Sequence, residues 1–144
     1  MPKRKTSKSR YQWVYDPPKP KKPKVPEATK ALVQERFDVL IETFYKPTYI
    51  KPPPTDNDFN YLVDFYGKWY RNYFYICGTY NCPSTRAISP SFEHRFSRFE
   101  YVDSDAFNVS YMRHTEKWWE FMQGLTLEEC LHEARTNHIL QPFG

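Results

Sequence analysis

Glycine and cysteine are both scarce in this sequence, and no long apolar run is present. Among its 144 residues there are only four glycines and three cysteines. An odd number of cysteines gives no complete disulfide framework and is typical of a reducing compartment. No segment reaches the roughly 18 consecutive apolar residues of a membrane helix, and the N-terminus lacks the apolar core of a secretory signal. We therefore expect a soluble protein of the cytoplasm, or of the nucleus if the host is eukaryotic.

The motifs of familiar enzyme classes are also missing. The chain has no G-x-S-x-G, phosphate-binding loop, H-E-x-x-H or dinucleotide-binding glycine pattern. His94 and His114 flank predicted strands, where a structural histidine is commoner than a general base. We therefore predict no catalytic residues and no cofactor, and favour a function without catalysis.

Acidic residues are nearly absent from the first 30 positions. This segment has ten Lys or Arg and two acidic residues, a net charge of +8, whereas the remainder has eleven and fifteen, a net charge of −4. Clustered cations release condensed counterions when they meet phosphates, so this segment predicts binding to nucleic acid or a ribonucleoprotein. The cations that we assign to this contact are Lys3, Arg4, Lys5, Lys8, Arg10, Lys19, Lys21, Lys22 and Lys24.

Proline is abundant in the same segment, with six residues between positions 1 and 26. Prolines among like charges favour an extended, flexible chain. We therefore divide the chain into a basic proline-rich arm, residues 1–26, and a single domain, residues 27–144. Within the arm, the aromatic cluster from Tyr11 to Tyr15 is either a segment packed on the domain or a stacking motif for a partner.

A helix is predicted immediately after the arm. Pro26 and Glu27 favour a helix start, because proline is preorganised for the first turn and a carboxylate there interacts well with the helix dipole. An apolar stripe with helical spacing follows, at Val33, Phe37, Leu40, Ile41 and Phe44. We expect this helix to end near Tyr45, because Lys46 precedes Pro47 and is thereby disfavoured in helical geometry.

The middle of the chain predicts an antiparallel sheet. Alternating residues run from Phe59 to Tyr66, Gly67-Lys68 suits a two-residue hairpin turn, and Trp69 to Cys77 forms the return strand. Three more strands are predicted at 92–102, 107–113 and 118–122. Their short connections imply a meander.

The last element has the capping-box spacing of Thr126 and Glu129, followed by an apolar stripe that begins at Leu127, so we predict a helix over 126–137. The expected fold class is α+β. About five antiparallel strands pack with an N-terminal and a C-terminal helix, and the basic arm precedes them.

Cys77 and Cys82 could be combined with His94, or with Cys130 and His132, into a zinc site. Structural zinc usually requires two closely spaced ligand pairs, and only one loose pair is present. We therefore predict no metal site.

The aromatic residues of the domain, 19% of the chain being Phe, Trp or Tyr, are interleaved with cations. Trp69, Arg71 and Tyr73 share one face of the predicted return strand with Tyr75. Arg95, Arg98, Arg113 and Lys117 lie on neighbouring strands or turns. Such rings can stack on bases while the cations meet phosphates, so we assign Trp69, Arg71 and Tyr73 to nucleic-acid binding. The alternative is that most of these rings belong to the core.

The last third of the chain contains Phe107–Thr115, Trp118-Trp119 and Leu127–Leu131 in succession. In this order it resembles short uncharacterised bacterial proteins of unknown function that end in a strand, a tryptophan-bearing strand and a helix. The resemblance implies no activity and transfers no functional residue.

Taken together, the sequence predicts a non-catalytic protein that binds nucleic acid or a ribonucleoprotein through its basic arm. One alternative is a protein-interaction module that uses the proline-rich arm for docking. Another is an unrecognised enzyme that acts on nucleic acid.

Overall fold

The computed structural model describes residues 23–55 and 59–142. Its centre is an antiparallel sheet with strand order β1-β2-β3-β4-β5. The strands are β1 (Tyr61–Tyr70), β2 (Tyr73–Asn81), β3 (Ser91–Asp103), β4 (Ala106–Met112) and β5 (Trp118–Leu125). The helical elements are α2 (Glu27–Leu40), the π-helical turn η1 (Ile41–Tyr45), α3 (Lys46–Tyr49), α4 (Leu127–Thr136) and the 3-10 turn η2 (His138–Leu140). The predicted α+β class, with an open meander and a helix at each end of the domain, is confirmed.

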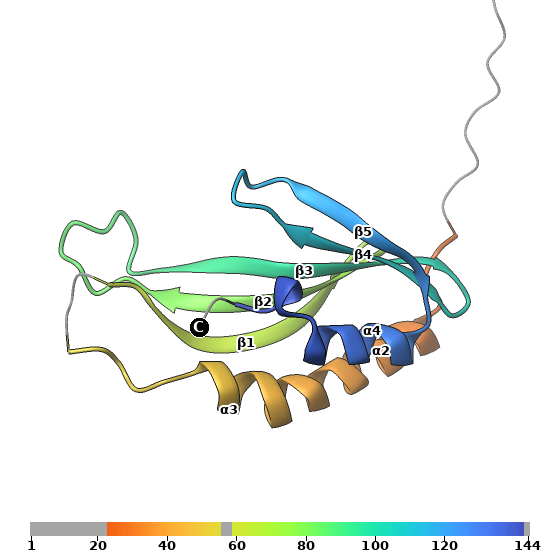
Figure 1. Cartoon of the computed structure of the whole chain (residues 1–144), viewed down its shortest axis with the longest axis horizontal. Coiled ribbons are helices and arrows are strands. Elements are labelled where there is room, and N and C mark those ends of the chain that lie inside the picture. Colours follow the sequence, from red (N-terminus) through yellow and green to blue (C-terminus); the bar gives the residue numbers. More distant parts are fainter. Residues whose placement is uncertain (1–22, 56–58, 143–144) are drawn as a thin grey trace, which may run out of the picture.

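The helices lie on one side of the sheet, which we call the covered face (Figure 1). Phe37 of α2 packs between Phe74 of β2 and Phe99 of β3, with ring centroids 4.9 Å away in each case. Tyr45 is fully buried, and its hydroxyl donates a 2.6 Å hydrogen bond to the carbonyl oxygen of Ala134 in α4. The core therefore consists largely of aromatic rings that lie between the sheet and the helices.

Helix α2 begins where the sequence predicts but continues further than expected. The carbonyl of Pro26 accepts the first helical bond from Lys30 N–H at 3.0 Å. The predicted end near Tyr45 is wrong, because the chain passes through η1 directly into α3, with Pro47 in its first turn. In η1 the N–H of Lys46 donates to Ile41, five residues back. Pro47 thus lies in the first turn of α3, where a proline is best tolerated in a helix.

The first hairpin turn lies four residues later than predicted. Gly67 is inside β1, opposite Ile76, and the turn is made by Arg71 and Asn72 between the paired Tyr70 and Tyr73. Gly67 is needed because a Cβ there would lie 2.3 Å from Cζ of Phe74. Arg71 takes the left-handed region with φ 54°, which a side chain rarely adopts. The remaining three strands match their predicted positions closely.

Helix α4 has the predicted capping box. The Thr126 hydroxyl accepts from Glu129 N–H at 3.1 Å, and the Glu129 carboxylate accepts from Thr126 N–H at 2.9 Å. Asp105, in the turn between β3 and β4, accepts a further bond from Leu127 N–H at 2.8 Å. The start of α4 is therefore attached to the sheet as well as capped.

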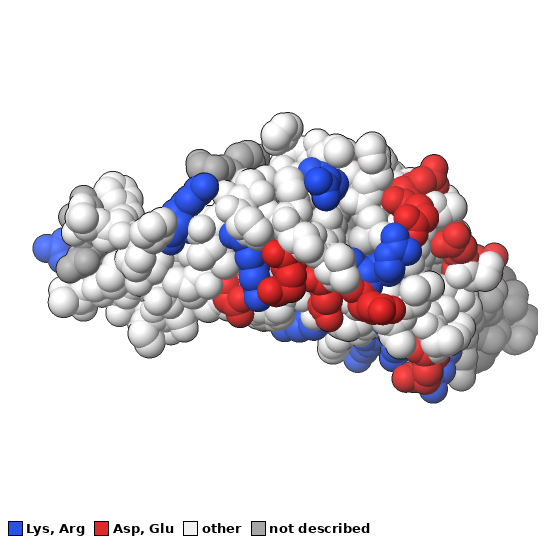
Figure 2. Space-filling view, turned by 90° about the horizontal axis from the view of Figure 1, so that it is seen from below, with Lys and Arg blue, Asp and Glu red and all other residues white. Residues whose placement is uncertain are grey.

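The surface seen from the side of the helices mixes charges of both signs (Figure 2). Arg36 of α2 forms an ion pair with Glu128 of α4 at 2.5 Å. Lys46 joins Glu42 at 2.5 Å and Asp64 of β1 at 3.4 Å. Within the described ranges, no helix is both long and apolar enough to cross a membrane.

Candidate functional site

The face of the sheet opposite the helices carries tyrosines, cations and one tryptophan. We call it the open face. Trp69 and Phe74 are paired across β1 and β2 and pack on the covered side, with ring centroids 5.4 Å apart. Because side chains alternate along a strand, their neighbours point the other way. The open face includes Tyr66, Lys68, Tyr70, Tyr73, Tyr75, Glu93, Arg95, Arg98 and Trp118. By the same alternation it also carries Glu100, opposite Tyr73, and Glu120, opposite Ser110.

Arginine side chains on the open face lie over aromatic rings. The guanidinium carbon of Arg98 is 4.6 Å from the ring centroid of Tyr73 and 4.9 Å from that of Trp118. Arg95 lies 4.6 Å over the ring of Tyr75. These cation–π contacts hold two guanidinium groups in a fixed arrangement beside one another.

Trp118 joins this group although it belongs to the far strand. Two strands separate β5 from β2, so in a flat sheet at about 4.8 Å per strand they would lie about 14 Å apart. The ring centroids of Trp118 and Tyr75 are nevertheless 5.6 Å apart. The sheet is therefore not flat but curves so that it brings β5 toward β2.

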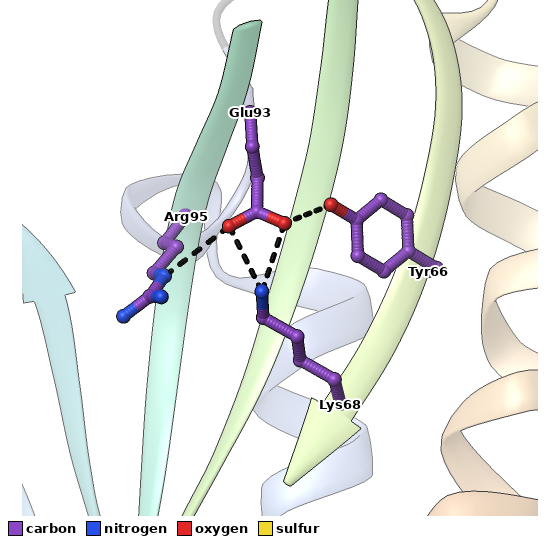
Figure 3. Close-up of polar contacts among 4 residues, drawn as sticks. All are labelled: Tyr66, Lys68, Glu93 and Arg95. Carbon is purple, nitrogen blue, oxygen red and sulfur yellow. Dashed lines mark hydrogen bonds and ion pairs between the residues drawn. The ribbon is translucent and has the colours of Figure 1, made fainter. Parts of the chain in front are cut away.

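Glu93 is surrounded by three donors on the open face (Figure 3). Its carboxylate accepts hydrogen bonds from the hydroxyl of Tyr66, from Lys68 Nζ at 2.9 and 3.0 Å, and from Arg95 Nε at 3.4 Å. Burial alone would raise the pKa of Glu93, but the bonds from Tyr66 and Lys68 outweigh it and lower the pKa. Glu93 thus remains ionised and positions Lys68 and Arg95.

Two of the three cysteines are buried free thiols. Cys77 is fully buried beside the Glu93 cluster, and burial raises its thiol pKa to about 12. Cys130 is buried on the inner side of α4, where burial likewise raises the thiol pKa to about 12. A thiol with such a pKa is a poor nucleophile at neutral pH. In residues 23–55 and 59–142, no three metal-ligating side chains gather at one point.

The predicted site residues of the domain lie in different places. Tyr73 is on the open face, and Arg71 is exposed in the hairpin turn, 5.2 Å over the ring of Tyr70. Trp69 is on the covered face instead, where its indole Nε1 donates to the carbonyl of Lys30 at 3.2 Å. The grouping of Trp69 with Tyr73 was wrong because the turn falls between them and reverses the alternation.

Of the predicted arm cations, Lys24 is exposed just before α2. The others, from Lys3 to Lys22, lie outside the described residues, as does the aromatic cluster from Tyr11 to Tyr15.

Arg95 and Arg98 were expected near the site from the sequence, whereas Tyr66, Lys68 and Trp118 were not. The alternation of Phe65, Gly67 and Trp69 on one face of β1 was the signal that could have placed Tyr66 and Lys68. No short-range signal links Trp118 to Tyr75, because their contact depends on how the sheet brings β5 toward β2.

Comparison with known proteins gives a family but no described relative. No curated protein and no solved structure matches the chain. One family model matches residues 25–141, which is most of the chain and not only its last third. The chain belongs to the family described as Domain of unknown function (DUF3024).

Proposed function

We propose that this protein is a non-catalytic, cytoplasmic binding protein for nucleic acid or a ribonucleoprotein, and that a single strand lies across its open face. The observation that supports this most is Arg98, held between Tyr73 and Trp118, with Arg95 over Tyr75 beside it. Bases stack on guanidinium planes as well as on aromatic rings, and the same cations attract phosphates.

The position of the arm supports the same proposal. The carbonyl of Pro23 accepts a 2.8 Å hydrogen bond from Asn72 Nδ2 in the β1–β2 turn, and Val25 is buried. The basic arm therefore joins the domain beside Arg71 and Tyr70, at one end of the open face. Its cations would add positive charge beside Arg71, at this end of the open face.

The test is titration of a fluorescein-labelled single-stranded oligonucleotide at several salt concentrations, read by anisotropy. Replacing Lys19, Lys21, Lys22 and Lys24 together by serine should flatten the slope of log affinity against log salt by about 2 to 4 units. Tyr73→Ala should weaken binding about tenfold, because stacking contributes about 1–3 kcal/mol per base. Arg135→Met is the control for the loss of one cation outside the proposed contact and should leave binding unchanged. Arg135 lies on the covered side, where its guanidinium is 5.2 Å from the ring centroid of Phe44.

Three outcomes would contradict the proposal. Absence of binding at low salt would reject nucleic acid as the partner. An arm effect without a Tyr73 effect would reject the open face as the contact. Conversion of the oligonucleotide to shorter products would identify an enzyme. The alternative is a protein partner that recognises the proline-rich arm through apolar pockets. Its affinity should depend only weakly on salt concentration.

A further inference from the structure

A concave site lies on the covered side of the sheet, beyond the end of α4. It is a half-open cleft of about 450 Å³, within the size range of small-molecule sites. Tyr80, His94, Phe96 and Tyr111 from the central strands form its aromatic floor. Arg113 and His114, in the turn between β4 and β5, lie at its rim, and the segment after η2 supplies the remaining wall.

The wall after η2 is held rigidly by Gln141. Its Nε2 donates to the carbonyls of Ala134 at 3.1 Å and Arg135 at 2.7 Å, and its Oε1 accepts from the hydroxyl of Tyr49 at 2.6 Å. The side chain thus links the segment to α4 and α3. This wall therefore exists before any ligand binds, which reduces the entropic cost of binding.

The floor is apolar and well packed. The ring of Tyr80 stacks on Phe92 at 5.2 Å with an interplanar angle of 8°, and His94 meets Phe96 edge-on at 4.7 Å. Rings fixed in this way offer a flat apolar surface to a ligand.

Four polar side chains that line the cleft make no hydrogen bond to the described residues. Across the described part of the chain, no hydrogen bond is made by the imidazoles of His94 and His114 or by the hydroxyls of Tyr80 and Tyr111. Burial lowers the pKa of His94, although nearby Glu116 opposes the shift, so its ring is neutral at pH 7 and can donate one hydrogen bond. These groups converge on the cleft without a partner.

The charge of the lining is one-sided. Arg113 contributes a permanent positive charge at the rim, where its guanidinium lies 4.9 Å over the ring of Trp119. Among the described residues that line the cleft, none is acidic. Glu116 is exposed in the turn and is not part of the lining. A ligand that matches both properties has an apolar body and a negative charge.

We propose that this cleft binds a small organic monoanion whose aromatic or apolar body lies on the Tyr80–Phe96 floor and whose carboxylate meets Arg113 and His114. The site is separate from the open face and would bind its ligand whether or not nucleic acid binds there.

The experiment uses the full chain and two matched pairs of probes, 4-phenylbutyrate with 4-phenylbutyramide and 1-naphthaleneacetate with 1-naphthaleneacetamide. Calorimetry at low salt gives the affinities, and amide NMR shifts locate the probe. At least one acid should bind about tenfold more tightly than its amide, because a charge-assisted hydrogen bond is roughly twice as strong as a neutral one. The largest shifts should fall at His94, Met112 and Ile139, which line the cleft.

Two variants test the parts of the site. Arg113→Met should remove the preference for the acid and leave the amide affinity unchanged, whereas Arg135→Met, a change of an arginine stacked elsewhere, should alter neither. Ile139→Trp should fill the cleft and abolish binding of both probes. Its control is Val39→Trp, which places the same ring on an exposed site of α2.

Equal affinities for acid and amide would overturn the assignment of an anion. Shifts confined to another surface, or no binding of either acid at millimolar concentration, would overturn the cleft itself. Because neither variant lies on the open face, oligonucleotide binding by both should equal that of the wild type, so failure of this proposal is distinguishable from failure of the first.

Discussion

The two faces of the sheet use the same residue types in different ways. On the covered face, rings contact rings: Phe37 touches Phe74 and Phe99, and all three are nearly fully buried. On the open face, rings contact guanidinium groups, as Tyr73 does with Arg98. A buried Phe is worth about 3–5 kcal/mol on truncation, whereas an exposed cation–π pair is worth about 0.5–1 kcal/mol. Aromatic rings therefore form ring–ring contacts in the core on the covered face and cation–π contacts on the open face, where Tyr75 is buried and Tyr73 is half-buried.

The largest expected effect is the loss of a ring from the covered face. Phe37→Ala should lower the free energy of unfolding by about 3–5 kcal/mol, because it leaves a cavity between α2 and the sheet. On the open face, Tyr70→Ala should cost less than about 1 kcal/mol, since this ring is 53% exposed. Urea denaturation of both variants is the measurement. Similar losses of unfolding free energy in the two variants would show that rings on the two faces contribute equally to stability.

Adding one methyl group to the covered face should also destabilise. Gly67→Ala would place its Cβ 2.3 Å from Phe74, whose ring is held by Phe37 and Trp69. Overpacking of this kind costs about 1–3 kcal/mol. Gly124→Asn is the control, because nothing lies within 4 Å of its position and asparagine tolerates the φ of 70° there. A denaturation midpoint for Gly67→Ala at or above that of the wild type would show that Phe74 can move aside.

A substitution at the start of α4 tests how firmly this helix is held on the covered face. Thr126→Ala removes the acceptor for Glu129 N–H and should lower the free energy of unfolding by about 1 kcal/mol. Thr136→Ala, which removes only an exposed bond to the His132 carbonyl at the other end of the helix, should cost less. Thermal unfolding followed by circular dichroism measures both. Equal midpoints for wild type and Thr126→Ala would mean that the bond to Asp105 holds the helix start alone.

The smallest effect concerns the open face and depends on pH. Because its folded pKa is lowered, Glu93 contributes stability that is present above the ordinary glutamate pKa of about 4.3 and is lost as pH falls through the lowered value. This contribution should not exceed about 1 kcal/mol, since the carboxylate is 30% exposed. In Glu93→Gln the free energy of unfolding should therefore fall less than in the wild type when the pH is lowered from about 5 to about 3. Urea denaturation at each pH measures this difference. Glu35→Gln, on the exposed side of α2, is the matched control. An unchanged pH profile for Glu93→Gln would contradict this role.

Local patterns predicted most of the fold. The stripe from Val33 to Leu40, the order of the strands and the Thr126 capping box depend on neighbouring residues and were confirmed. The hairpin turn was misplaced because glycine usually marks a turn, whereas Gly67 accommodates the ring of Phe74 from the next strand. A turn built on Arg71 has no comparable signal in residue type.

The sites were less accessible to prediction from the sequence. Tyr73 and the arginines of β3 were identified from alternation, but the misplaced turn assigned Trp69 to the wrong face. The cleft could not be predicted, because its wall depends on how Gln141 folds back on α4. Such contacts arise from tertiary structure and not from spacing.

The bonds that close the covered face join opposite ends of the domain. Arg36 meets Glu128, Tyr45 meets Ala134 and Tyr49 meets Gln141, at sequence separations of 92, 89 and 92 residues. During synthesis, α2 and the first strands leave the ribosome well before these partners. The aromatic side chains of α2 and these strands therefore remain exposed to solvent until α4 has been synthesised. Contacts of such long range also slow folding. A chain that stops before α4 should therefore yield an aggregation-prone fragment, because residues 127–142 supply the partners that close the covered face.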